Sequence, residues 1–137
     1  MARMGPPRSV ERRLRLAVVA EREPVPARHE TPEIDAAALV AARAADRLLA
    51  AAVAAGSARW VRYLGAMPDR FRDEPIPALR ASARAGRAAF GVKDSIRDTL
   101  PASATEPFLI AIDRLLKLIA RWEMHRYDSD RGSTRDR

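Results

Sequence analysis

The chain has 137 residues, of which 47% are hydrophobic and 31% are charged, and its formal net charge is +7. This length predicts a single domain that buries its own core, and the composition excludes wholesale disorder or a collagen-like repeat. Because the sequence contains no cysteine, disulfides, thiolate metal sites and cysteine nucleophiles are excluded, and the cytoplasm is the expected location. Its two histidines offer few general bases or metal ligands, so we expect no metal or cofactor.

The sequence predicts no segment that targets or spans a membrane. An apolar run near the N-terminus, residues 14–20, is short and is interrupted by Arg15. The alanine-rich stretch 36–55 would place three charged residues near the centre of a bilayer, and alanine is too weakly apolar to offset them: Arg43, Asp46 and Arg47. We therefore expect no membrane contact.

Helix signals run along the whole sequence, whereas long alternating strand patterns and Asn-Gly or Asp-Gly turns do not occur. Residues 1–8 are rich in glycine and proline and are expected to form a disordered arm. Ser9 is placed to cap a first helix over about 10–22, which Pro24 and Pro26 end.

A long second helix is expected over 32–55. Thr31 offers a capping oxygen, Pro32 suits the first helical position, and Glu33 favours the positive end of the helix dipole. Gly56 follows as the left-handed residue with which many helices end.

Shorter helical segments follow the second helix. Ser57 is placed to cap the third helix, and Gly91 to end the fourth. The expected segments are 57–65, a turn at 68–72, 75–91 and a short helix at 93–99. These signals predict an all-α fold, a compact array or bundle of five to six helices in one domain over 9–127.

The last helix, from Ser103 or Thr105 to near Tyr127, carries the widest apolar surface, and 128–137 is expected to be a disordered polar tail. Its apolar residues cover about 200° of the circumference, about twice the usual width of a buried stripe. Because the other helices are rich in alanine, we expect a second copy of the chain to cover part of this surface. The predicted homodimer interface lies at or near Phe108, Ile112, Leu116 and Ile119.

The fourth helix carries a basic stripe at spacings i, i+4 and i+7, on the side away from Leu79 and Phe90. Like charges at such spacings repel by about 0.2–0.5 kcal/mol per pair, and an anionic partner would relieve this repulsion. The alternative is a solvated face whose cations pair with Asp94, Asp98 or carboxylates of other helices. The candidate residues for binding an anion or a partner are Arg80, Arg84, Arg87, Lys93 and Arg97.

Residues 87–100 partly match a DNA-binding helix-turn-helix. That motif requires a small residue four positions before the turn glycine and an aliphatic residue six positions after it. With Gly91 as the turn glycine, these two positions hold Arg87 and Arg97.

The sequence favours binding over chemistry. Neither a glycine-rich phosphate loop nor a hydrolase or metalloprotease motif occurs, and the acids beside His29 stand where a helix start attracts them. We therefore expect a non-enzymatic helical interaction or accessory protein that self-associates through its last helix or binds another protein. One alternative is a nucleic-acid-associated protein that uses the basic stripe, and a third is a small helical enzyme without a recognisable site.

Overall fold

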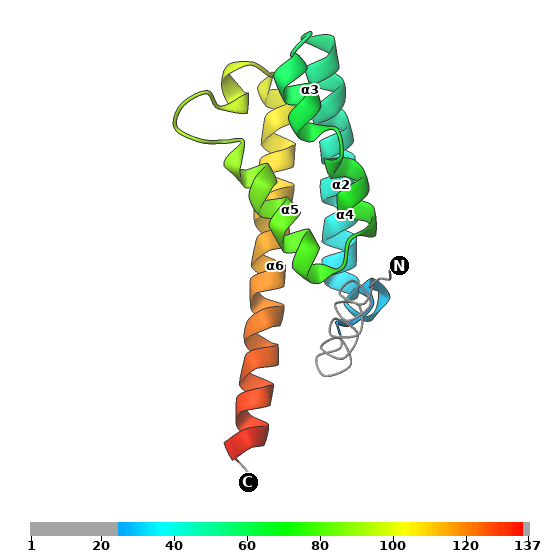
Figure 1. Ribbon diagram of the computed structural model, residues 1–137, viewed down its shortest axis with the longest axis vertical. Coiled ribbons are helices and arrows are strands. Elements are labelled where there is room, and N and C mark those ends of the chain that lie inside the picture. Colours follow the sequence, from blue (N-terminus) through cyan, green and yellow to red (C-terminus); the bar gives the residue numbers. More distant parts are fainter. Residues whose placement is uncertain (1–24, 136–137) are drawn as a thin grey trace, which may run out of the picture.

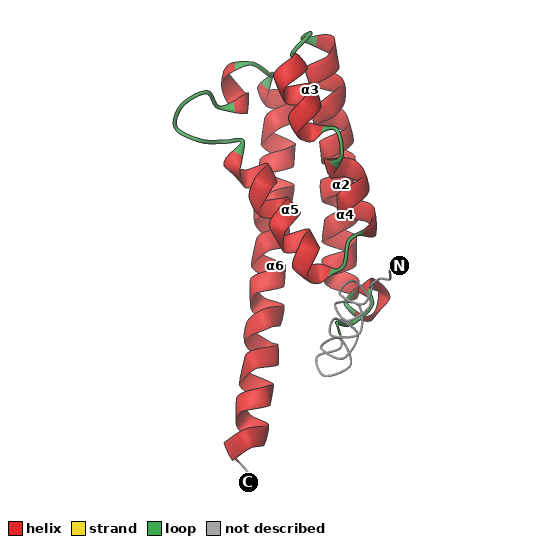
Figure 2. Cartoon of the chain, viewed as in Figure 1, coloured by secondary structure: helices red, strands yellow, loops and turns green. Residues whose placement is uncertain are grey.

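The computed structural model describes residues 25–135, and this part of the chain is all-α, as the sequence predicts (Figures 1 and 2). The arm expected at 1–8, the helix expected over 10–22 and residues 136–137 lie outside the described residues. None of the described helices is long and apolar enough to cross a membrane.

Two long helices form the first layer of the fold. Helices α2 (Pro32–Ala54) and α6 (Ala102–Arg135) run antiparallel and share the most extensive contact in the described structure (Figure 1). Short 3-10 turns, Arg28–Glu30 and Ile96–Asp98, precede α2 and α6 respectively.

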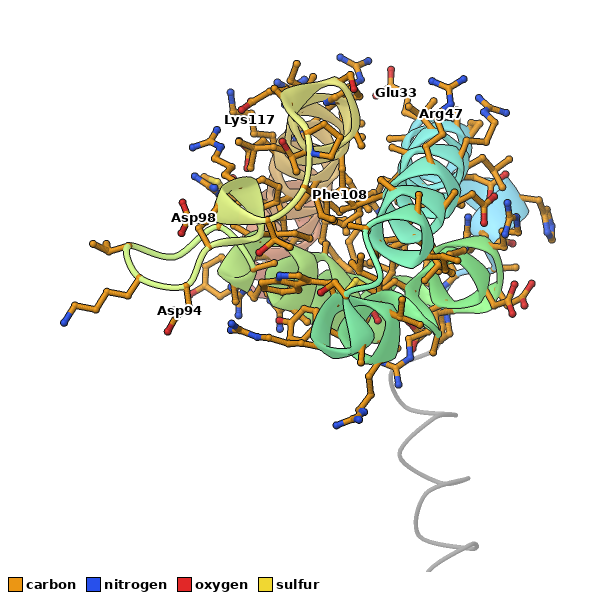
Figure 3. All side chains as sticks on the ribbon, turned by 90° about the horizontal axis from the view of Figure 1, so that it is seen from above. Glu33, Arg47, Asp94, Asp98, Phe108 and Lys117 are labelled. Carbon is orange, nitrogen blue, oxygen red and sulfur yellow. The ribbon has the colours of Figure 1, made fainter. Side chains whose placement is uncertain are left out.

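Three shorter helices form the second layer, which covers one face of the first. They are α3 (Ala58–Leu64), α4 (Met67–Asp73) and α5 (Ile76–Ala88). Seen along the long axis, α2 and α6 lie on one side of the molecule and these three lie on the other (Figure 3). One face of the α2–α6 pair is therefore left uncovered by the described chain.

Alanine forms most of the buried surface of α2. Ile34 and Leu48 are the only larger side chains that this helix buries. Small side chains allow helix axes to approach to about 8 Å, the short end of the usual range. The seven buried alanines of α2 are Ala37, Ala38, Ala41, Ala42, Ala44, Ala45 and Ala52.

Arg28 fixes the start of α2 against the end of α4. Its Nε donates to Oδ1 of Asp35 at 2.9 Å, and its Nη1 donates to the carbonyl oxygens of Phe71 at 2.6 Å and Glu74 at 3.3 Å. A cation beside the last carbonyls of a helix is favourable. The expected side-chain cap by Thr31 is wrong, because its hydroxyl instead donates to the carbonyl of Arg28 at 3.2 Å.

The turn between α2 and α3 follows the local sequence signals. Gly56 adopts a left-handed conformation, with φ of +67°, directly after α2. The Ser57 hydroxyl accepts a hydrogen bond from the Trp60 amide at 3.4 Å and so caps α3. Both expectations for this turn are confirmed.

Helix α6 is longer than the sequence indicates. It continues past Tyr127 to Arg135, so most of the segment 128–137 is helical rather than an irregular tail. Its only proline is Pro107, near its start, and no later proline stops it. Figure 1 shows α6 running well beyond the ends of its neighbours toward the C-terminus.

Phe108 of α6 lies at the centre of the core (Figure 3). Its ring centroid is 6.3 Å from that of Phe71 in α4 and 6.2 Å from that of Phe90 after α5. Gly86 makes room for it, since a Cβ at this position would lie 2.9 Å from Cζ of Phe108. This close approach joins α5 to α6.

The four side chains of the predicted dimer interface lie in or against the core of the described chain. Phe108 and Ile112 are fully buried and Ile119 is almost so, while Leu116 is partly buried against the same core. The alanine face of α2 and the close approach at Gly86 let the chain cover these side chains itself. They are core residues, and no second copy is needed to cover them.

Gly86→Ala is expected to destabilise the protein by about 1–3 kcal/mol, because the added methyl group meets a rigid, fully buried ring. This loss outweighs the gain of about 1 kcal/mol that alanine brings inside a helix. Urea unfolding of the Gly86→Ala and Gly91→Ala variants, each compared with the unmodified protein, tests this expectation. At Gly91 the nearest atoms to an added Cβ are 3.8 Å away, so an equal effect of the two substitutions would contradict the steric argument.

Ile112→Ala is expected to lower the free energy of unfolding by about 2–5 kcal/mol without changing the molecular mass in solution. The matched control is Ile110→Ala, since Ile110 is on the same helix but 68% exposed. Denaturant unfolding and light scattering report the two quantities separately. A change of mass at unaltered stability would restore Ile112 to a subunit interface.

Candidate interaction surface

Three of the five cations in the predicted basic stripe are paired with carboxylates. Arg80 Nη1 lies 2.9 Å from Oε2 of Glu123, and Arg87 Nε lies 3.2 Å from Oδ1 of Asp113. Both acids belong to α6, so these ion pairs tie α5 to α6. Arg97 forms a two-pronged contact with Glu106, also in α6, at 3.0 and 3.2 Å.

The other two cations of the stripe lie apart from these pairs. Arg84 and Lys93 are exposed and have no carboxylate partner among the described residues. Of the acids expected to pair with the stripe, those of another helix do so, whereas the carboxylate of Asp98 accepts from the amide of Ser95 at 3.1 Å. Three arginines of the stripe therefore pair with carboxylates of the fold, and the other two cations face solvent and are available to an anionic partner.

The helix-turn-helix interpretation of residues 87–100 is wrong. After α5 ends at Ala88, the chain forms a loop and then only the 3-10 turn Ile96–Asp98. Ser95 caps this turn, and Leu100 is buried in the core rather than presented on a second helix. No recognition helix stands between α5 and α6.

A groove follows the uncovered side of the α2–α6 pair, which we call the open face. Three neighbouring depressions make up this groove, and Glu33 lines all of them. The middle of its floor is formed by short apolar side chains from both helices: Ala36, Ala37, Val40 and Ala111. One end, of about 370 Å³, lies between the start of α2 and Trp122 of α6.

Cations border the open face on both helices. Arg43 and Arg47 are one turn apart on α2, and Arg114, Lys117 and Arg121 follow each other at helical spacing on α6. Figure 3 shows Arg47 and Lys117 on the same outer side of the two-helix layer, away from Phe108. All five are exposed, and none has a carboxylate partner within residues 25–135.

Few acids oppose these five cations on the open face. Asp113 lines the groove but is already paired with Arg87. Glu30 lies at one end, where its carboxylate accepts from the amide of Ala27 at 3.0 Å. Apart from Asp113, the face therefore holds two carboxylates, Glu30 and Glu33, against five cations, so it is basic.

Exposed aliphatic side chains lie among the cations of the open face. Val40, between the arginines of α2 and Glu33, is 46% exposed, and Ile110 of α6 is 68% exposed. Ile110 lines the same depression as Arg114 and Lys117. The open face therefore presents an apolar strip with a basic border.

The acids around His29 serve local structure. Asp35 pairs with Arg28, and Glu30 closes the turn before α2. Within the described part of the chain, no three histidine or acidic side chains stand close enough together to hold a metal ion.

The sequence contains part of the signal for the open face. The spacing of Arg114, Lys117 and Arg121 marks a basic side of the last helix, and Arg43 and Arg47 repeat at i, i+4. What periodicity alone cannot give is that these two sides lie next to each other. Comparison of the chain with protein families, characterised proteins and solved structures gives no match.

Removal of one α5–α6 ion pair is expected to have a small, coupled effect. Arg80→Ala should lower the free energy of unfolding by about 0.2–1 kcal/mol, because both partners are roughly 40% exposed. A double-mutant cycle with Glu123→Ala isolates the coupling between them. Arg84→Ala, which removes an arginine without a described partner, is the control, and a larger loss there than at Arg80 would contradict this assignment.

Proposed function

We propose that this protein is a cytoplasmic, non-enzymatic accessory protein, a bundle-like array of helices whose open face binds another macromolecule. The observation that carries the proposal is the groove of the open face, which has an apolar floor and cations along its border. Five cations of this face have no carboxylate partner within residues 25–135, whereas five arginines that link other elements of the fold are paired. Those paired arginines are Arg28, Arg72, Arg80, Arg87 and Arg97.

The pairing of Arg72 illustrates the contrast. Its guanidinium in α4 hydrogen-bonds to the carboxylate of Asp46 in α2, and this hydrogen bond raises the pKa of Arg72. Elsewhere on α2, Arg43 and Arg47 are spaced i, i+4 and repel each other by about 0.2–0.5 kcal/mol, as do the cations of α6 at similar spacing. Binding of an anionic group would remove this repulsion, so the open face favours an anionic partner.

A second copy of this chain fits the open face poorly. A symmetric dimer would place the same patch of both subunits together, so basic side chains would meet basic side chains. The charge of this face favours a different macromolecule over the self-association expected from the last helix.

A photo-crosslinking amino acid tests the proposal in living cells of the source organism. Placed at Val40, in the floor of the groove, it is expected to capture a macromolecule in good yield. The control position is Val92, which is fully exposed in the loop after α5 and lines none of the depressions of the open face. Gel shifts, with and without nuclease, and mass spectrometry identify what is captured.

Capture at Val40 and not at Val92 supports binding through the open face. No crosslink at Val40, or the same products from both positions, would reject it. A Val40 product that nuclease removes would favour the nucleic-acid alternative over a protein partner.

A further inference from the structure

We infer that the partner presents an acidic amphipathic helix, which lies in the groove between α2 and α6. This inference rests on the proposed function and names the chemistry of the partner. Grooves between two helices commonly receive a third helix by its apolar face, with specificity from charged side chains at the edges. The open face has the shape, the apolar floor and the charged border that this mode requires.

The length of the groove matches a short helix. From Ile110 to His125, which line two of the three depressions, α6 rises about 22 Å, at 1.5 Å per residue. On α2, the same groove extends from Glu33 to Val40. A partner helix of about four turns would lie along its full length.

The floor of the groove suits close helix packing. Ala36, Ala37 and Ala111 have side chains short enough to admit a third helix at the usual 8–10 Å between axes. Val40 and Ile110 are exposed aliphatic groups whose burial would contribute favourably, at about 25 cal/mol per Å² of apolar surface. An apolar stripe on the partner would cover both.

The border of the groove requires an acidic partner. Arg114, Lys117 and Arg121 line the groove on the α6 side, and Arg43 and Arg47 follow Val40 along α2. Acidic side chains along one flank of the partner's apolar stripe would meet the row on α6, and an acidic end of the partner would meet the two arginines of α2. Glu33 is the single groove acid without a described partner, and it would favour one basic residue on that helix.

Other occupants fit the open face less well. The phosphate backbone of a nucleic acid would use the cations but would leave Val40 and Ile110 without a role, because phosphates make no apolar contacts. The segment 1–24 of this chain carries six arginines against three glutamates, so it has the same sign as the face. A helix that is both acidic and amphipathic accounts for the cations and for the aliphatic strip together.

Fluorescence anisotropy with three labelled probes tests the inference. The first probe is an amphipathic peptide of leucine, alanine and glutamate about 18 residues long, or about 27 Å as a helix. The second has the same composition in shuffled order, and the third is a DNA duplex of similar length. The full chain is expected to bind the amphipathic peptide at least about tenfold more tightly than the shuffled one, a difference of about 1.4 kcal/mol.

Two matched double variants locate the binding surface. Arg114→Glu with Lys117→Glu is expected to weaken binding of the amphipathic peptide by at least about tenfold. Arg84→Glu with Lys93→Glu makes the same change in net charge on the other side of the molecule and is expected to leave the affinity within about twofold. All four side chains are exposed, and circular dichroism checks that both variants retain the helical fold. Val40→Asp, which adds charge to the apolar floor, should also weaken binding.

The outcomes separate this inference from the proposed function. Equal affinity for the amphipathic and shuffled peptides, tighter binding of DNA, or equal losses in the two double variants would overturn the acidic helix. If in these cases Val40 still captures a macromolecule in cells, the open face remains the binding surface and only the class of partner changes. Absence of any capture at Val40 would overturn the proposed function itself.

Discussion

The arrangement of this molecule depends on the alanine face of α2. Alanine loses almost no side-chain entropy on burial, and its small size lets α2 lie close against α6. Each methyl group buries little apolar area, so most of the large buried side chains come from the other helices, among them Trp60, Phe71 and Phe108. The same small side chains at the outer edge of the contact leave a shallow groove. The alanines of α2 thus account both for the close packing of the core and for the shallow groove of the open face.

Ion pairs between arginines and carboxylates join the two layers of the fold. Arg72 of α4 reaches Asp46 on α2, and Arg80 and Arg87 of α5 reach Glu123 and Asp113 on α6. Each exposed pair contributes little on its own. Cations without a described carboxylate partner remain on both layers, among them Arg62, Arg70 and Arg84 on the second layer and the five cations of the open face. The net charge of the sequence therefore says little about where a partner could bind until the ion pairs of the folded chain are known.

Sequence reasoning succeeded where the deciding contacts are local. Gly56 and Ser57 act within four residues of their partners, so the end of α2 and the start of α3 could be predicted. It failed where the deciding partner is remote: Glu123 is 43 residues from Arg80, and helix periodicity contains nothing about that distance. The wide apolar arc of α6 was recognised, but not that α2 and α5 approach closely enough to cover it. For the same reason the basic residues of α6 were visible in the sequence, and their alignment beside Arg43 and Arg47 was not.

The contact between Gly86 and Phe108 also bears on how this chain can change in evolution. A side chain at position 86 is compatible with the present core only if the ring at position 108 becomes smaller or moves, because the two occupy the same space. The two positions should therefore covary among descendants of this protein, with a methyl group gained at one accompanied by volume lost at the other. A lineage that passes through the uncompensated intermediate would first need a stabilising substitution elsewhere. The contact between Gly86 and Phe108 is thus also a barrier on the mutational paths open to the fold.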